Sequence, residues 1–194
     1  MENNKRFSQS DNSLHMIITR CRSGDSSAFK EIMETHYRYT YAIAFKILHN
    51  ETGAKDIVQE SFIRVWKNIS SYQPEKKFTT WLYRIVVNLC YDKLKADSRQ
   101  RKYVTNLNQL HDKDRISVQQ SAERDIEMKD MGEKIISIAK TLPPKQQLVF
   151  SMRDLQDLSL EEISQLTGIS LNSVKANLSY ARQYIRRKIE ELEQ

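Results

Sequence analysis

Residues 159–182 read SLEEISQLTGISLNSVKANLSYAR and contain the clearest structural signal in the chain. The first serine of this stretch and Glu162 have the spacing of a capping box, in which the two side chains cap a helix start reciprocally. Gly168 can adopt the left-handed conformation of a tight turn, and Ser170 or Asn172 can cap a second helix. A short capped helix, a glycine turn and a longer helix are together typical of a helix-turn-helix.

The second helix of this motif is basic on one side. Five residues between Ser173 and Lys188 are basic and none is acidic. The second helix of a helix-turn-helix enters the major groove of duplex DNA, so this charge favours DNA binding. An ordinary helical hairpin stays open as the alternative, because Ile163, Val174 and Leu178 would form a core in either case.

Apolar residues recur at helical spacing through most of the remaining chain, and no period-two pattern of a strand competes. The chain holds only four glycines and three prolines, which also favours helices. The fold class we expect is all-α. The helical stripes that carry this expectation cover residues 29–48, 57–69, 78–94, 131–142, 148–155, 163–166 and 174–192.

The expected layout is two small helical domains joined by a flexible linker. The segment between the stripes, from Ser98 to Asp125, is polar and lacks a sustained apolar face. The expected parts are a disordered tail (residues 1–12), a first domain (13–98), a linker (99–125) and a second domain (126–194).

Composition narrows the class of protein. The net charge of +6 hints at a polyanionic partner. No run of 18 uncharged apolar residues and no signal-peptide core occur, so we expect a soluble, cytoplasmic protein without membrane insertion. Cys21 and Cys90 stand far apart, which indicates neither a disulfide framework nor a zinc site. The phosphate-loop, dinucleotide, nucleophile-elbow and zinc-protease motifs are all missing, so we expect no enzyme, no cofactor and no metal.

Two stretches of the first domain could bind partners. Residues 78–102 are aromatic at one end and basic at the other, a combination that could hold unstacked bases, although Trp81 and Ile85 fit a core equally well. Asn88 lies beside the apolar stripe, where an amide could read a base edge or simply face solvent. Residues 56–69 form an amphipathic helix that could dock on a partner helix or only pack in its own domain.

Four stretches in order resemble the sigma-70 family of RNA polymerase sigma factors, in its short extracytoplasmic-function (ECF) group. Asp56–Trp66 resembles the core-polymerase-binding helix of sigma region 2, and Phe78–Asn88 resembles its promoter-melting and −10-reading segment. Leu142–Phe150 and the helix-turn-helix ending at Arg182 are similar to sigma region 4. The recognition helix carries fewer arginines than many relatives, so the promoter sequence does not carry over.

The resemblance implies a transcription initiation factor that performs no catalysis itself. Its partners would be core RNA polymerase (the β′ clamp helices and the β flap), promoter DNA and an anti-sigma factor. The residues implied for core binding are Asp56, Gln59, Glu60, Phe62, Arg64 and Trp66. Those implied for the −10 element are Tyr72, Gln73, Lys76, Lys77, Thr79 and Asn88. Those implied for the −35 element are Ser170, Asn172, Ser173, Lys175, Ala176, Asn177, Ser179 and Tyr180, with Arg153 and Arg182 nearer the phosphates.

Two other functions remain open on the sequence. A two-domain helix-turn-helix regulator would bind duplex DNA without polymerase. An RNA-binding antiterminator would use the aromatic residues of the first domain. Promoter-directed transcription in a purified system separates both from a sigma factor.

Overall fold

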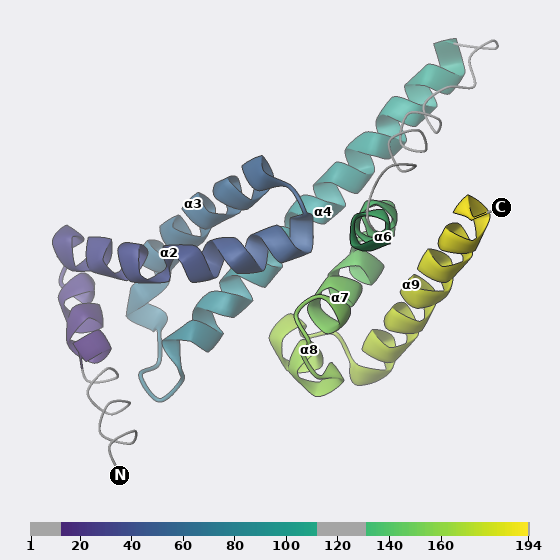
Figure 1. Ribbon diagram of the computed structural model, residues 1–194. Coiled ribbons are helices and arrows are strands. Elements are labelled where there is room, and N and C mark those ends of the chain that lie inside the picture. Colours follow the sequence, from purple (N-terminus) through teal and green to yellow (C-terminus); the bar gives the residue numbers. More distant parts are fainter. Residues whose placement is uncertain (1–12, 112–130, 194) are drawn as a thin grey trace. The chain divides into compact units, whose positions relative to one another are not determined.

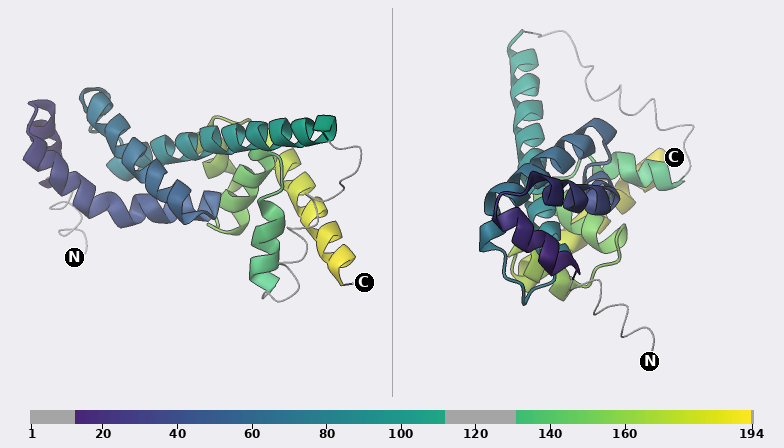
Figure 2. Two further views of the ribbon diagram at one scale, coloured as in Figure 1. Left: turned by 90° about the horizontal axis from the view of Figure 1, so that it is seen from above. Right: turned by 90° about the vertical axis from the view of Figure 1, so that its left-hand side faces the viewer.

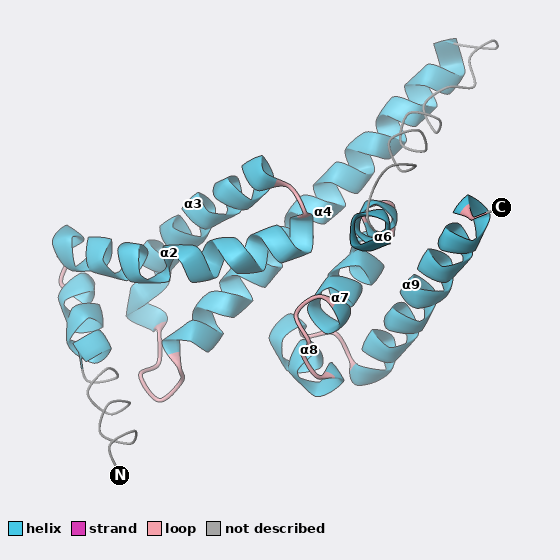
Figure 3. Ribbon diagram, viewed as in Figure 1, coloured by secondary structure: helices cyan, strands magenta, loops and turns pink. Residues whose placement is uncertain are grey.

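The computed structural model describes residues 13–111 and 131–193. Within these two ranges every regular element is a helix, and no strand occurs (Figures 1 and 3). The all-α fold class is therefore confirmed. The tail expected over residues 1–12 lies outside the described residues.

The chain divides into two compact units. One comprises Met1–Phe45 and Asn50–Leu89, and the other comprises Lys46–His49 and Cys90–Gln194. The expectation of two helical domains is confirmed, whereas their limits at 13–98 and 126–194 stay predictions.

The helices of the first half start and stop at recognisable residues. Residues 13–22 are helical, and Gly24, with φ of +88°, makes the turn that leads into α2 (Ser26–Leu48). The side chain of Asn50 caps α3 (Glu51–Asn68) by accepting a hydrogen bond of 2.8 Å from the backbone N–H of Gly53. The short 3-10 helix η1 (Ile69–Ser71) and a loop then lead to α4 (Phe78–His111).

The apolar faces of α2, α3 and α4 bury many of the residues that the helical spacing selected, although Met33 and Tyr37 of α2 stay exposed. Phe62 on α3 is 2% exposed, and Ile32 on α2 is 1% exposed. Leu82 and Val86 on α4 are fully buried. Burying one such side chain contributes about 1.5–3 kcal/mol, which is why the polar residues of these helices are left for the surface.

Residues 131–193 fold as four helices. They are α6 (Met131–Ala139), α7 (Pro144–Asp154), α8 (Leu160–Thr167) and α9 (Leu171–Leu192). Pro144 is suited to the first turn of α7, since a residue there has no intrahelical partner for its N–H. A core cluster joins Ile138 of α6, Phe150 of α7 and Ala181 and Ile185 of α9.

Helix α4 extends into the range in which a linker is expected, and the limits of that linker stay a prediction. The helix is unbroken to His111, thirteen residues into the range 99–125 (Figure 2). No glycine or proline occurs between Phe78 and His111, so nothing in the covalent chain stops the helix where its apolar stripe fades. Residues 112–125 of the expected linker lie outside the described residues.

Two general findings complete the description. No helix in the described ranges is long and apolar enough to cross a membrane. Cys21 and Cys90 are both buried and carry free thiols. Burial raises the pKa of the Cys90 thiol, which keeps it protonated at neutral pH.

Candidate functional surfaces

Helix α3 presents a mixed polar and apolar face to solvent. Asp56 and Gln59 are exposed, and the half-buried Glu60 accepts a hydrogen bond of 3.2 Å from Nε of Arg64, one turn later. Ile63 is 47% exposed in the middle of this face. The face therefore combines hydrogen-bonding groups with an apolar centre, as helix-docking surfaces do.

One residue implied for this face belongs to the core instead. Phe62 is 2% exposed and packs edge-to-face on Phe29 of α2, with ring centroids 6.4 Å apart. Trp66 contacts the same phenylalanine at 4.9 Å but keeps 37% of its surface exposed. The exposed apolar residue that sequence reasoning missed is Ile63. Its signal was present, because Ile63 is an isoleucine that falls outside the apolar stripe of its helix.

The loop between η1 and α4 packs against a cluster of aromatic side chains. Tyr72, implied for DNA contact, is only 6% exposed, and its ring lies 5.5 Å from Phe78 and 5.3 Å from Trp81. The hydroxyl of Tyr72 donates to the backbone oxygen of Lys76, so this buried side chain stabilises the loop. His36 of α2 completes the cluster at 5.0 Å from Phe78. Burial lowers the pKa of His36, and this imidazole is therefore neutral at pH 7.

The loop exposes the polar residues expected of it. Gln73, Lys76 and Lys77 of the loop are exposed, and so is Thr79 in the first turn of α4. The backbone N–H of Lys76 donates to the carbonyl of Gln73 at 3.0 Å, which closes a tight turn. Lys76 and Lys77 therefore extend from a loop whose backbone is fixed by a hydrogen bond.

Arg22 fastens the start of this loop, and sequence reasoning missed it. Its Nε donates to the carbonyl oxygen of Ile69 at 3.3 Å, and its guanidinium also donates to the carbonyl oxygen of Tyr72. A single arginine in a helix gives no periodic or motif signal, so only the fold could reveal this contact.

Asn88 is a surface residue of α4, and its role in binding stays a prediction. It is exposed, between the buried Val87 and Leu89. Thr80 and Arg84 precede it at intervals of four residues, so all three lie along one side of α4.

The helix-turn-helix has the geometry that the sequence indicated. The Ser159 hydroxyl accepts from the backbone N–H of Glu162 at 3.1 Å, and the Glu162 carboxylate accepts from the backbone N–H of Ser159 at 2.8 Å. Gly168 has φ of +72°, and Ser170 caps α9. The predicted capping box, left-handed glycine and Ser170 cap are therefore confirmed. The backbone hydrogen bond from Ser159 lowers the pKa of Glu162.

The residues that the resemblance implies for the −35 element fall into two groups on α9, exposed and half-buried. Asn172, Lys175, Ala176, Ser179 and Tyr180 are exposed, the last at 60%. Ser173 and Asn177 are half-buried, and the Asn177 amide donates to the Ser173 carbonyl at 2.7 Å and to its hydroxyl at 3.2 Å. The exposed residues are available to a ligand, whereas the polar groups of Ser173 and Asn177 are partly occupied by hydrogen bonds between the two residues.

The two arginines expected near phosphates have partners inside this unit. Arg153 donates to the Leu158 carbonyl at 3.0 Å and to the Asp157 carboxylate at 3.3 Å, across the turn after α7. Arg182 of α9 makes a two-pronged ion pair with Asp154 of α7, with Nε 3.0 Å from Oδ2. Both arginines therefore stabilise contacts within this unit, and nearby aspartates partly neutralise their positive charge.

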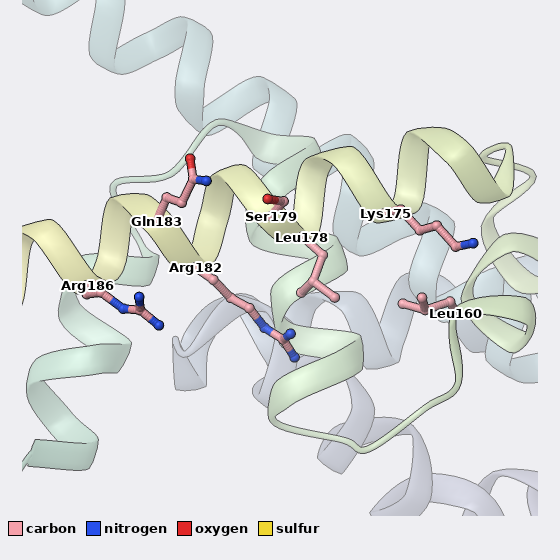
Figure 4. Close-up of a pocket in the computed structure, with 7 residues that line it drawn as sticks. All are labelled: Leu160, Lys175, Leu178, Ser179, Arg182, Gln183 and Arg186. Carbon is pink, nitrogen blue, oxygen red and sulfur yellow. The ribbon is translucent and has the colours of Figure 1, made fainter.

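A shallow depression of about 370 Å³ runs beside α9 (Figure 4). Lys175, Arg182 and Arg186 line it on α9, and Leu160 lines it from the start of α8. Lys175 and Arg186 give this side of α9 a positive edge, whereas Arg182 between them is paired with Asp154, and such an edge suits a phosphate backbone better than a small molecule.

Comparisons with known proteins agree with this arrangement. The family model described as Sigma-70 region 2 matches residues 32–100, and the one described as Sigma-70, region 4 matches residues 132–185. The ECF RNA polymerase sigma factor SigW of Bacillus subtilis is 30% identical over 90% of this chain and 96% of its own. The ECF RNA polymerase sigma factor SigE of Mycolicibacterium smegmatis is 29% identical over 84% of this chain and 63% of its own.

One solved structure supports the fold. The sigma factor RpoE from Bartonella quintana, solved with the anti-sigma factor NepR, matches with a TM-score of 0.54 at 16% identity. The match covers 84% of this chain and 96% of that one. The helical surfaces, the two family matches and the full-length similarity to SigW lead to one assignment: the chain belongs to the sigma-70 family of RNA polymerase sigma factors, in its ECF group.

Proposed function

We propose that this chain is an alternative sigma factor that binds core RNA polymerase, directs it to promoters by reading −10 and −35 elements, and helps to melt the −10 region. The observation that carries the proposal is the presence of both sigma regions in one chain, each with an exposed polar surface. In this proposal the chain itself catalyses nothing, and it acts in the cytoplasm, where the polymerase transcribes the chromosome.

Core polymerase would bind the exposed face of α3. Asp56, Gln59 and Glu60 offer hydrogen-bonding groups, and Ile63 and Trp66 offer apolar surface. Partner helices of the β′ clamp would lie along this face. Phe62 is left out of the contact set because it is buried.

The −10 element would be read by the α3–α4 loop and Asn88. An exposed amide on a rigid helix can make hydrogen bonds to one flipped base, and each good pair of such bonds is worth about 1–3 kcal/mol of discrimination. Extruding the base costs a few kcal/mol, which these contacts must offset. Lys76 and Lys77 would hold the adjoining phosphates.

The −35 element would be read by the exposed side of α9. Asn172 and Lys175 lie in its first turns, where a recognition helix meets base edges, with Ser179 and Tyr180 further along. The β flap is the second polymerase surface that we assign to this domain, on the family resemblance alone. An anti-sigma factor is proposed on the same footing, with NepR on the Bartonella factor as the precedent.

The decisive experiment is transcription in a purified system. Core polymerase alone should start poorly on a promoter library, and adding the chain should select a defined set of start sites. The chain carrying Gln59→Ala and Glu60→Ala should fail to be captured by core enzyme while keeping its helical circular dichroism. A wild-type chain that binds DNA but never associates with core polymerase would favour the helix-turn-helix regulator instead.

A second experiment tests the −10 assignment. Asn88→Ala should flatten the preference for one −10 base while leaving core capture unchanged. Lys93→Ala, on the same helix but rotated about 140° away, serves as the matched control. Equal losses at every −10 variant would contradict base reading by Asn88.

A further inference from the structure

Arg22 is the last residue of the helix over residues 13–22, and it contacts the loop that precedes α4. Its Nε donates to the carbonyl oxygen of Ile69 at 3.3 Å, and its guanidinium also donates to the carbonyl oxygen of Tyr72. The two acceptors lie 47 and 50 residues further along the chain. Both bonds are partly buried, and a hydrogen bond from a charged donor is stronger there than in water. Arg22 therefore attaches its own helix to the start of the loop.

The two acceptors explain why the residue is an arginine. They belong to η1 and to the residue that follows it, at the end of the helical segment that α3 begins. The last carbonyl groups of a helix have no intrahelical partner, and a cation beside them is favoured by the helix dipole. A planar guanidinium offers several N–H donors in a fixed geometry, so it can bind two carbonyl groups at once, whereas an ammonium is a point charge on a flexible stem.

Tyr72 links the arginine to the far end of the loop. Its carbonyl group accepts from the guanidinium, and its hydroxyl donates to the backbone oxygen of Lys76. Its ring packs against Phe78 and Trp81, with centroids 5.5 Å and 5.3 Å away. The backbone N–H of Lys76 in turn donates to the carbonyl oxygen of Gln73 at 3.0 Å. The backbone and the side chain of Tyr72 are thus both fixed, and the loop closes between them.

We propose that Arg22 is a positioning residue for promoter recognition, which fixes the backbone of Tyr72 and thereby holds the loop in the shape that selects the −10 base. The inference rests on the proposed function, in which the loop and Asn88 bind the −10 element. A site that is already in its bound conformation loses less conformational entropy on binding. Without Arg22 the loop would sample further conformations, some of which accept bases that the fixed loop excludes. Selectivity between bases should therefore fall more than overall affinity for DNA.

Arg20 supplies a matched control on the same helix. Arg20 and Arg22 are both exposed and lie two residues apart. The guanidinium of Arg20 pairs with Asp25 at 2.8 Å and with Glu31 at 3.3 Å, and it donates to the hydroxyl of Ser27. These partners all precede the loop in the sequence and lie outside it. Arg20→Ala therefore removes the same charge from the same helix without releasing Tyr72.

The first test measures amide hydrogen exchange by NMR in the free full-length chain. Arg22→Ala should speed exchange at the hydrogen-bonded amide of Lys76 about tenfold, relative to the buried amides of α3, because the loop opens locally. Arg22→Lys should recover part of the protection, and Arg20→Ala should leave it unchanged. If Arg22→Ala does not fold, Arg22→Gln takes its place. Unchanged exchange at Lys76, or equal effects of the Arg22 and Arg20 variants, would overturn the role of Arg22 in fixing the loop.

The second test measures base selectivity in the holoenzyme. Promoter fragments that differ only in the −10 base assigned to Asn88 are compared by their rates of open-complex formation. The ratio of the preferred to the substituted fragment should fall about tenfold for Arg22→Ala, within the range that one base contact supplies. Arg22→Lys should recover part of the ratio, and Arg20→Ala should keep it.

This ratio separates positioning from mere stability. A lower amount of folded protein slows both fragments equally and leaves the ratio unchanged, so an unchanged ratio for Arg22→Ala contradicts the proposal. An equal fall for Arg20→Ala contradicts it as well. Failure of the proposed function looks different, because the wild-type chain then selects no promoter, while hydrogen exchange still decides whether Arg22 fixes the loop.

Discussion

Arg182 of α9 and Asp154 of α7 form a two-pronged ion pair that ties the recognition helix to the helix behind it. The pair lies at the surface, with the Arg182 side chain 52% exposed and Asp154 23% exposed. Hydrogen bonding to Asp154 raises the pKa of Arg182, so its guanidinium stays positively charged and is paired with the Asp154 carboxylate. Arg182 was expected to contact DNA phosphates because it lies on a basic helix. In the folded protein its guanidinium instead pairs with Asp154.

The first prediction concerns this pair. Arg182→Ala and Asp154→Ala should show a coupling free energy of about 0.2–1 kcal/mol in a double-mutant cycle on unfolding, as exposed pairs do. Asp154→Ala also frees the guanidinium, so duplex DNA should bind with a salt slope steeper by roughly one. Urea denaturation and fluorescence anisotropy measure the two effects. A shallower slope for Asp154→Ala would contradict the assignment of Arg182 as a shared charge.

The second prediction separates two neighbours on α3. Phe62→Ala should destabilise the first unit by about 3–5 kcal/mol, because it removes a buried aromatic side chain. Ile63→Ala should leave thermal stability nearly unchanged and weaken capture by core polymerase, because Ile63 is 47% exposed. Calorimetry and a polymerase pull-down read the two outcomes. Full capture by Ile63→Ala would remove this residue from the proposed interface.

The third prediction compares two helix caps. Ser159→Ala should cost about 1 kcal/mol, because the hydroxyl accepts at 3.1 Å within a complete capping box. Ser170→Ala should cost less, since its hydroxyl lies 3.4 Å from the backbone nitrogen of Ser173 and no reciprocal bond accompanies it. Chemical denaturation of the two variants gives the order, and the reverse order would show that the reciprocal bond adds nothing.

The fourth prediction is a pH dependence at the aromatic cluster. Burial lowers the pKa of His36 below its ordinary value of 6.5. The unfolded chain therefore binds the proton more readily, so this contribution to stability is complete above pH 6.5 and is lost as the pH falls toward the lower folded-state value. His36→Gln should reduce the loss of melting temperature between pH 7.5 and 5.5. An unchanged loss would place the titrating group elsewhere.

Local signals in the sequence determined most of the helices and the caps and turn of the helix-turn-helix. Ser159, Glu162, Gly168 and Ser170 act through bonds and dihedral angles within a few residues, so their roles can be read from spacing alone. The family resemblance likewise depended on short ordered motifs, and the similarity to SigW agrees with it. Asn88 was correctly expected at a surface position, because one polar residue beside an apolar stripe defines its side of the helix.

Tertiary structure alone decided which side chains are free to meet a partner. Phe62 and Tyr72 looked like contact residues but fill cores made by other helices, and Arg182 was claimed by Asp154, 28 residues away in sequence. Arg22 holds a loop about 50 residues further on, a pairing that no periodicity encodes. The physical reason is the same in each case: local spacing sets the side of a helix on which a residue lies, whereas burial and ion pairing depend on what the rest of the chain places against that side.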